Sequence, residues 1–133
     1  MHKTQLTPHH IGCLTDNIKK SISTYEKMGF SAKSEIYFVS SQNVKVCFIE
    51  IRNLFYLELI EFSKENHSLN KIFKTGNPYY HIGYQVGNIQ SAISELQAQG
   101  FYLVNQFSSE AFQGNLCAFL YSPEMQLIEL IEK

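Results

Sequence analysis

Residues 10–12 of the chain read His10-Ile11-Gly12, and residues 81–83 repeat the same letters as His81-Ile82-Gly83. The offset of 71 residues between these copies recurs along the chain without a gap. At this offset lie Asn17-Ile18 and Asn88-Ile89, Ile22-Ser23 and Ile93-Ser94, Gly29-Phe30 and Gly100-Phe101, Phe48 and Phe119, and Glu58-Leu59-Ile60-Glu61 and Glu129-Leu130-Ile131-Glu132. A repeat of this kind indicates two copies of one structural module.

Each half has the apolar spacing of one amphipathic helix. Within residues 16–28, Asp16 is expected to cap the start of a helix and Gly29 to follow its end. Residues 88–99 repeat the pattern and are followed by Gly100. We therefore expect one helix in each half.

One β-rich run precedes each helix and three follow it, separated by residues that favour turns. The expected strands are 8–15, 34–39, 44–51 and 54–62 in the first half, and 79–86, 101–107, 116–121 and 126–132 in the second. Each half is thus predicted to be a βαβββ module, which makes the fold class α+β. The 133 residues are expected to form a single domain, with modules over 5–62 and 76–133 and a linker over 63–75 that includes a short helix over 69–73.

Composition excludes several classes of partner. Eleven basic residues nearly balance 12 acidic ones, for a formal net charge of −1, so we expect no nucleic acid and no membrane surface as partner, and a small-molecule substrate instead. The three cysteines show no C-x-x-C pairing, which predicts reduced core residues. Residues 1–5 lack the apolar region of a signal peptide, and no apolar run approaches a membrane span, so we expect a cytoplasmic protein.

Two glutamates occupy equivalent positions inside apolar runs. Glu58 lies between Leu57 and Leu59, and Glu129 between Ile128 and Leu130, so both carboxylates are expected to be buried. A buried carboxylate needs a cation, a set of hydrogen bonds or a metal ion, or else its pKa rises.

Two histidines, His10 and His81, begin the opening strand of each module. Imidazole and carboxylate are ligands of zinc, iron, nickel and cobalt. If the modules are related by an approximate two-fold axis, His10, Glu58, His81 and Glu129 can converge on one divalent ion. The alternative for each residue alone is a structural role, because a strand-initial histidine is usually hydrogen-bonded, a strand glutamate usually faces solvent, and duplication copies structural residues too.

The second glutamate of each pair, Glu61 or Glu132, has the opposite strand parity and is expected to face outward. His9 likewise is expected to point away from His10. His2 and His67 lie in a tail and in the linker, and neither is given a role.

The chain resembles the vicinal oxygen chelate superfamily, which includes glyoxalase and bleomycin-resistance proteins, over nearly its whole length. The carrying motifs are 9–12 (HHIG), 56–61 (YLELIE), 80–84 (YHIGY) and 127–130 (LIEL). Within the superfamily the chain is most similar to methylmalonyl-CoA epimerase-like and glyoxalase-like proteins. The resemblance implies paired βαβββ modules that form a cup-shaped half-barrel, a homodimer, and one divalent metal ion, which could be Co, Ni, Zn, Mn or Fe. It names His10, Glu58, His81 and Glu129 as the metal ligands.

The resemblance also implies a metal-dependent isomerase or lyase that moves a proton on the carbon next to a substrate carbonyl. In such members the metal stabilises an enolate or enediolate while a carboxylate takes and returns the proton. The catalytic residues would be Glu129, as the base, and Glu58. The sequence departs from the epimerase-like pattern at residues 41–43, where a Glu-Gln-Gly run is often found, and its single arginine, Arg52, is not placed to bind glutathione.

Two other functions stay open. A non-enzymatic protein of the bleomycin-resistance type would sequester an aromatic or cationic ligand without metal. The aromatic surface available for that is Tyr37, Phe38, Phe55, Tyr84, Phe107 and Phe112. A ring-cleaving dioxygenase would use ferrous iron with two histidines and one carboxylate, against which the additional carboxylate of Glu58 and the short chain count.

Overall fold

The computed structural model describes residues 5–133, so His2 and the rest of residues 1–4 lie outside the described residues. The chain divides into two compact units. The first unit contains residues 10–80, and the second contains residues 81–133 together with residues 5–9. Strands β1 and β6 each begin in one unit and end in the other, because the divisions fall immediately before His10 and before His81.

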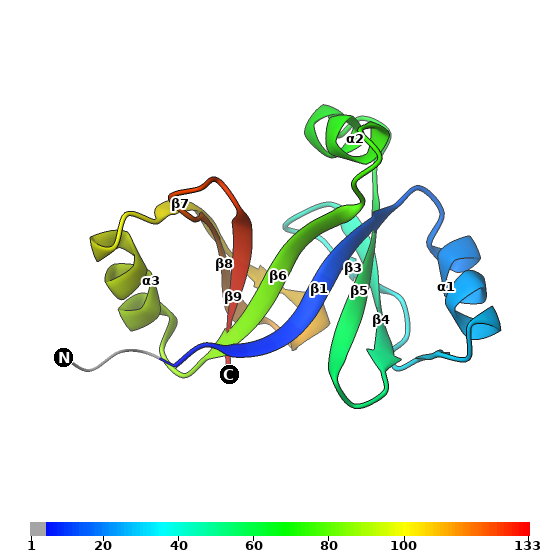
Figure 1. Cartoon of the computed structure of the whole chain (residues 1–133), viewed down its shortest axis with the longest axis horizontal. Helices are drawn as coiled ribbons and strands as arrows, with labels where there is room; N and C mark the ends of the chain where they lie inside the picture. The colour runs from blue at the N-terminus through cyan, green and yellow to red at the C-terminus, as the bar shows by residue number, and fades with distance from the viewer. Residues whose placement is uncertain (1–4) are drawn as a thin grey trace. The chain divides into compact units, whose positions relative to one another are not determined.

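The described elements follow the predicted order (Figure 1). In the first half they are β1 (Thr7–Thr15), α1 (Ile18–Lys27), β2 (Ser31–Ala32), β3 (Tyr37–Val39), β4 (Val44–Ile51), β5 (Phe55–Phe62) and α2 (His67–Lys74). In the second half they are β6 (Tyr79–Val86), α3 (Ile89–Ala98), β7 (Tyr102–Ser109), the 3₁₀ helix η1 (Glu110–Phe112), β8 (Asn115–Tyr121) and β9 (Leu127–Glu132). The α+β class and the short linker helix are confirmed.

Both units have the same strand pairing. In the first unit the sheet order is β2-β4-β5-β1, with β3 also paired to β4. In the second unit the order is β6-β9-β8-β7. The strand that precedes the helix runs parallel to the last strand of its module, as β1 does to β5 and β6 to β9, while the remaining pairs are antiparallel.

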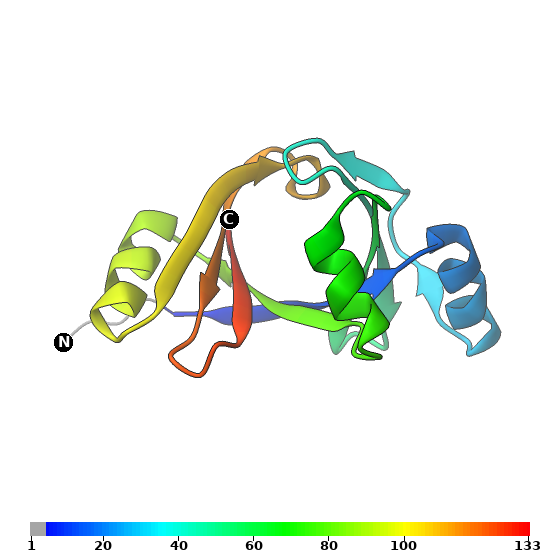
Figure 2. The ribbon, with the colours of Figure 1, turned by 90° about the horizontal axis from the view of Figure 1, so that it is seen from above.

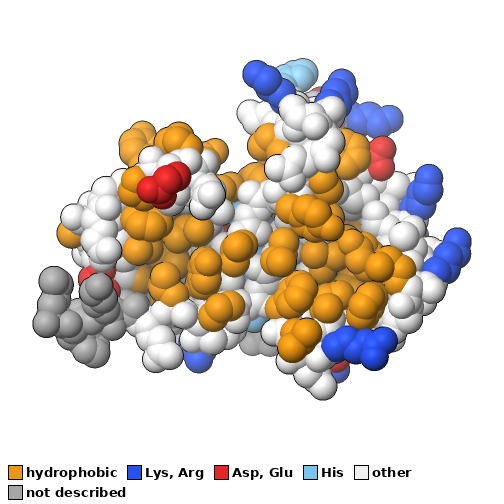
Figure 3. Space-filling model, viewed as in Figure 1, with side chains coloured by type: hydrophobic (Ala, Val, Ile, Leu, Met, Phe, Trp, Pro, Cys, Tyr) orange, Lys and Arg blue, Asp and Glu red, His pale blue; other side chains and the backbone are white. Residues whose placement is uncertain are grey.

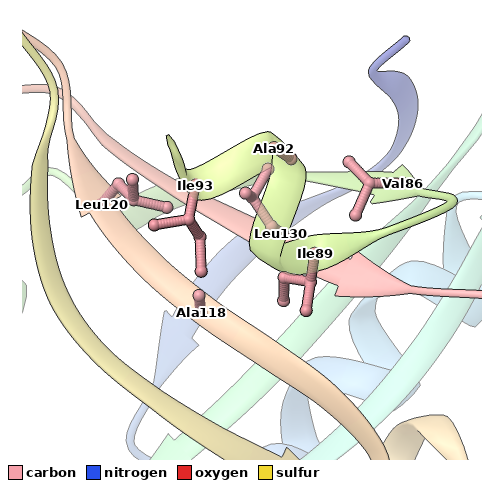
Figure 4. Packing of buried hydrophobic residues seen from close by; sticks show 7 residues of the cluster. All are labelled: Val86, Ile89, Ala92, Ile93, Ala118, Leu120 and Leu130. Atoms are coloured by element: carbon pink, nitrogen blue, oxygen red, sulfur yellow. The ribbon is translucent and has the colours of Figure 1, made fainter. Parts of the chain in front are cut away.

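A helix covers one face of each sheet. In the first unit α1 packs on β4 and β5, and Figure 2 shows the strands of this unit between α1 and α2. The buried core of the first unit is formed by Cys13, Ile18, Cys47, Ile49, Leu57 and Leu59. In the second unit α3 packs on β7, β8 and β9, and its core is formed by Val86, Ile89, Ala92, Ile93, Ala118, Leu120 and Leu130 (Figure 4). Since alternate strand residues face the helices, the residues between them face the other side of each sheet.

The first helix begins one residue later than its predicted cap would place it. The N-cap is Asn17, not Asp16, because the extended backbone of Asn17 lets its side chain accept a hydrogen bond from the Lys20 N–H at 3.1 Å. Asn88 caps α3 in the same way, accepting from Ser91 N–H at 2.9 Å. Gly29 follows the end of α1 with a φ of +96°, as predicted.

The strand predicted over 34–39 covers only β3, residues 37–39, and the short strand β2 at residues 31–32 was not predicted. Residues 33–36 leave the ladder between β2 and β3. At that point the Ser34 hydroxyl accepts a hydrogen bond from the Phe48 N–H at 3.0 Å, and the Lys33 N–H donates to the Phe48 carbonyl at 2.7 Å. A side chain therefore replaces part of the backbone pairing that the sequence pattern predicted.

Basic side chains of the first unit gather on its two helices. Figure 3 shows lysine and arginine side chains over α1 and α2, and the exposed lysines of these helices are Lys19, Lys20, Lys27, Lys71 and Lys74. These charges lie on the solvent side of amphipathic helices. Among the described residues, no helix has the length and apolar character that crossing a membrane requires.

Candidate metal-binding site

In the first unit the structure brings His10 and Glu58 together. His10 lies on β1 and Glu58 on the adjacent parallel strand β5, where Gly12 is its register partner. The imidazole Nε2 lies 3.3 Å from the carboxylate Oε1. His10 is only 2% exposed and Glu58 5%, so the predicted burial of this carboxylate is confirmed.

In the second unit His81 and Glu129 form the equivalent pair. His81 lies on β6, Glu129 lies on the parallel strand β9, and Gly83 is its register partner. The distance from Nε2 to Oε1 is 3.2 Å, and the two residues are 5% and 4% exposed. The repeat in the sequence is therefore a repeat of one side-chain arrangement.

The glycine of each repeated triplet explains how the pair forms. Histidine and glycine, two residues apart on one strand, face the same side of the sheet as the glutamate. Gly12 and Gly83 have no side chain to fill the space beside Glu58 and Glu129, their register partners. The imidazoles of His10 and His81, two residues before these glycines, occupy that space. Both glycines are buried.

The repeated phenylalanines, Phe48 and Phe119, were given no role in the site by the sequence analysis. Phe48 pairs in register with Glu58, and Phe119 pairs with Glu129. Each ring meets the imidazole of its unit edge-on, with ring centroids 6.0 Å apart for His10 and Phe48 and 5.2 Å apart for His81 and Phe119. These rings form apolar walls beside the imidazoles. Their shared offset was the signal that could have placed them here.

Strand parity predicts that Glu61 and Glu132 face outward, but each carboxylate contacts the start of a helix. The parity is opposite to that of Glu58 and Glu129, but it turns these carboxylates toward the helices. Glu61 accepts a hydrogen bond from the Ile18 N–H at 2.8 Å, and Glu132 accepts one from the Ile89 N–H at 3.0 Å. Each carboxylate thus holds the first residue of a helix.

The donor set of each pair fits a divalent metal ion. Two ligand atoms each about 2.1 Å from one ion are about 3.0 Å apart at a right angle and about 3.4 Å apart at the tetrahedral angle. The observed distances of 3.3 and 3.2 Å lie between these values. Each pair can also exist as a charge-assisted hydrogen bond if the imidazole is protonated. One pair supplies two ligands, whereas a zinc site typically has three or four protein ligands.

The cysteines take no part in these pairs. Cys13, Cys47 and Cys117 are free thiols and buried, as predicted. Burial raises the pKa of the Cys13 thiol, and it also raises the pKa of Cys47 in spite of an opposing hydrogen bond with Ser34. Two of these thiols are therefore held in the neutral form.

The chain is similar to known proteins in sequence and in fold. The sequence model of the glyoxalase/bleomycin resistance protein/dioxygenase superfamily matches residues 9–121. No curated protein matches the sequence. Hypothetical protein BH1468 from Bacillus halodurans C-125 has a solved structure that is 28% identical, with a TM-score of 0.80, over 99% of this chain and 96% of that one.

Two solved epimerases also have this fold. Methylmalonyl-CoA epimerase from Mycobacterium tuberculosis is 17% identical, with a TM-score of 0.80, over 99% of this chain and 92% of that one. The Streptomyces coelicolor methylmalonyl-CoA epimerase, solved in complex with 2-nitronate-propionyl-CoA, is 20% identical, with a TM-score of 0.82, over 97% of this chain and 99% of that one. These likenesses confirm the predicted fold class.

Proposed function

The chain belongs to the glyoxalase/bleomycin resistance protein/dioxygenase superfamily, and from this premise we propose that it is a divalent-metal-dependent isomerase or lyase. The reaction moves a proton on the carbon next to a substrate carbonyl. The observation that carries the proposal is the buried imidazole–carboxylate pair that occurs once in each unit, with nearly equal distances of 3.3 and 3.2 Å.

We propose that His10, Glu58, His81 and Glu129 together hold one metal ion. All four side chains are buried, and two neutral imidazoles with two carboxylates balance the charge of a divalent cation. The two pairs occupy equivalent positions in the repeat, which supports one shared ion. One pair alone supplies two ligands, which is fewer than a zinc site typically has. An ion held there would supply Lewis-acid polarisation of a substrate oxygen.

In this proposal Glu129 is the base that takes the proton from carbon and returns it, and Glu58 is the equivalent carboxylate of the first unit. A carboxylate beside an apolar wall such as Phe119 is shielded from water, which keeps the proton from exchanging freely with solvent. Burying two carboxylates costs stability unless a cation compensates them. This supports the enzyme over a metal-free ligand-sequestering protein of the same superfamily.

Metal content tests the proposal. Untagged protein, stripped with a chelator, is loaded in turn with Co, Ni, Zn, Mn and Fe(II), dialysed, and analysed for metal per chain. We expect about one equivalent per chain, lost in His81→Ala and kept in the matched control His67→Ala, which removes an exposed imidazole from α2. Metal-free protein under every loading would contradict the proposal and favour the ligand-sequestering alternative.

Proton exchange then tests the chemistry. The loaded protein is incubated in D₂O with methylmalonyl-CoA, which belongs to the substrate class of the epimerases with this fold, and separately with the hemithioacetal of methylglyoxal and glutathione. Glu129→Gln should abolish deuterium incorporation while leaving the circular dichroism spectrum unchanged, because glutamine keeps the shape but cannot accept a proton. Exchange at the wild-type rate in Glu129→Gln would remove Glu129 from the role of base.

A further inference from the structure

Strand β7 contains one extra residue in the second unit. Leu103 pairs with Leu120, and the next pair along the ladder is Asn105 with Phe119. Val104 therefore has no partner on β8 and forms a β-bulge. Such a bulge reverses the side of the sheet that the following side chains face.

The contacts on either side of the bulge show this reversal. Before it, Leu103 packs against the buried core cluster of the second unit, which includes its register partner Leu120, labelled in Figure 4. After it, Gln106 bonds to Gln90 of α3 at 2.8 Å, so Gln106 faces the helix. Asn105, adjacent to Gln106 in the strand, therefore faces the opposite side.

That opposite side is the face of the second unit that carries Glu129. Asn105 pairs in register with Phe119, and Phe119 pairs with Glu129, so the three side chains form one row across β7, β8 and β9. Phe107, two residues after Asn105, stacks on Phe119 with ring centroids 5.3 Å apart. The bulge thus places one amide beside an aromatic pair in the row of the candidate base.

The amide oxygen of Asn105 is buried, and no hydrogen-bond donor among residues 5–133 reaches it. The equivalent position in the first module is Ser34, at the same offset of 71 residues. Ser34 is satisfied within its own unit, since its hydroxyl accepts a hydrogen bond from the Phe48 N–H. A buried acceptor without a donor costs stability. The fold therefore does not require the amide of Asn105, whereas it uses the hydroxyl of Ser34.

We propose that Asn105 is a substrate-contacting residue, whose amide oxygen accepts a hydrogen bond from an O–H or N–H group of the bound substrate. The stacked rings of Phe107 and Phe119 would pack against an apolar part of the substrate next to that group. The substrate class is then a carbonyl compound that carries a hydroxyl or amide donor beside an apolar segment. This inference rests on the proposed function, because it takes the face of Glu129 to be the reacting face.

Thermal unfolding of the metal-free protein tests whether the Asn105 amide is kept for a ligand. Asn105→Leu replaces the amide by an apolar side chain of similar size, and we expect the Tm to stay within about 1 °C or to rise, by up to about 5 °C. Ser34→Ala, the matched variant of the satisfied position, should lower the Tm by about 3–6 °C. If Asn105→Leu lowered the Tm as much as Ser34→Ala does, the amide would have a structural partner, and the proposal would be overturned.

Steady-state kinetics of the metal-loaded protein gives the second readout. With methylmalonyl-CoA or the glutathione hemithioacetal, Asn105→Leu should raise KM at least about tenfold, while kcat changes by less than about twofold and metal content stays that of the wild type. Gln106→Leu is the control, because this neighbouring amide faces α3, and its KM should not change. An unchanged KM in Asn105→Leu would overturn the proposal.

The two readouts separate this proposal from the proposed function. If the wild-type protein binds metal but turns over neither substrate, the proposed reaction fails on both compounds. The Tm comparison of Asn105→Leu with Ser34→Ala is made without metal or substrate, and it still overturns or supports the statement that the fold does not require the Asn105 amide.

Discussion

The carboxylate of Glu61 accepts a hydrogen bond from the backbone N–H of Ile18, the first residue of α1, 43 residues earlier in the chain. The first N–H groups of a helix have no partner within the helix, and they carry the positive end of its dipole. Glu132 makes the same bond to Ile89 in the second unit. The strand that presents the candidate metal ligand therefore also holds the start of the helix behind it.

Removing this bond should destabilise the protein. Glu61→Ala is expected to lower the free energy of unfolding by about 1–2 kcal/mol, because the helix loses a charged acceptor at its first turn. Urea unfolding followed by circular dichroism measures the change. Glu35→Ala, which removes an exposed carboxylate from the same unit, should change it by less than about 0.5 kcal/mol. If the two substitutions changed the free energy of unfolding equally, the hydrogen bond from Ile18 N–H to Glu61 would not stabilise the protein.

Metal binding should stabilise the folded protein. A ligand present at about 100 times its Kd raises the free energy of unfolding by about 2.7 kcal/mol. We expect Co²⁺ or Zn²⁺ to raise the Tm of the wild-type protein by several degrees, and EDTA to reverse the rise. In His10→Ala the rise should be lost, since this substitution removes one ligand. An undiminished rise in His10→Ala would place the ion elsewhere.

Gly100 should be intolerant of alanine because of its backbone conformation. Its φ is +92°, and an added Cβ would meet only Pro123 Cγ at an ordinary contact of 3.5 Å, so the cost comes from the backbone. Gly100→Ala is expected to cost about 1–2 kcal/mol of stability. Gly87→Ala, where an added Cβ meets nothing within 4 Å, should be nearly neutral. Chemical denaturation of both variants under the same conditions distinguishes a backbone cost from a packing cost.

The buried thiols should make stability fall at high pH. Burial raises the pKa values of the Cys13 and Cys47 thiols above their usual range. The folded protein therefore keeps these protons at a pH at which the unfolded chain releases them. The contribution is complete below about pH 9 and is lost as the pH rises through the folded pKa values. In Cys47→Ala the slope of unfolding free energy against pH above 9 should be shallower, and an unchanged slope would contradict the assignment.

Much of the fold could be predicted because the repeat presents each element twice. The strands over 44–51 and 79–86 have the predicted bounds, and Gly29 and Gly100 follow the two helices. The predicted cap of α1, Asp16, lies one residue before the observed cap, Asn17. Both residue types cap helices well, and only the backbone conformation separates them. The homodimer and the cytoplasmic location stay predictions.

The candidate site was predictable in its parts. Repetition and burial selected the two histidines and two glutamates, and the structure pairs each histidine with the glutamate of its own unit. Strand parity alone could not show that Glu61 reaches a helix start. The orientation of Asn105 could not be predicted either, because it depends on a bulge that only the pairing of β7 with β8 reveals.

The division of the chain immediately before His10 and before His81 bears on the order of folding during synthesis. Residues 10–80 are contiguous, so the first unit can complete its own contacts while the ribosome is still translating the second half. The second unit cannot complete its core as early, because Leu6 packs against core residues that all lie at position 84 or later in the chain. At about 5–20 residues per second, the earliest residues wait several seconds for these partners. During synthesis, the histidine–glutamate pair of the first unit can thus form before the pair of the second unit.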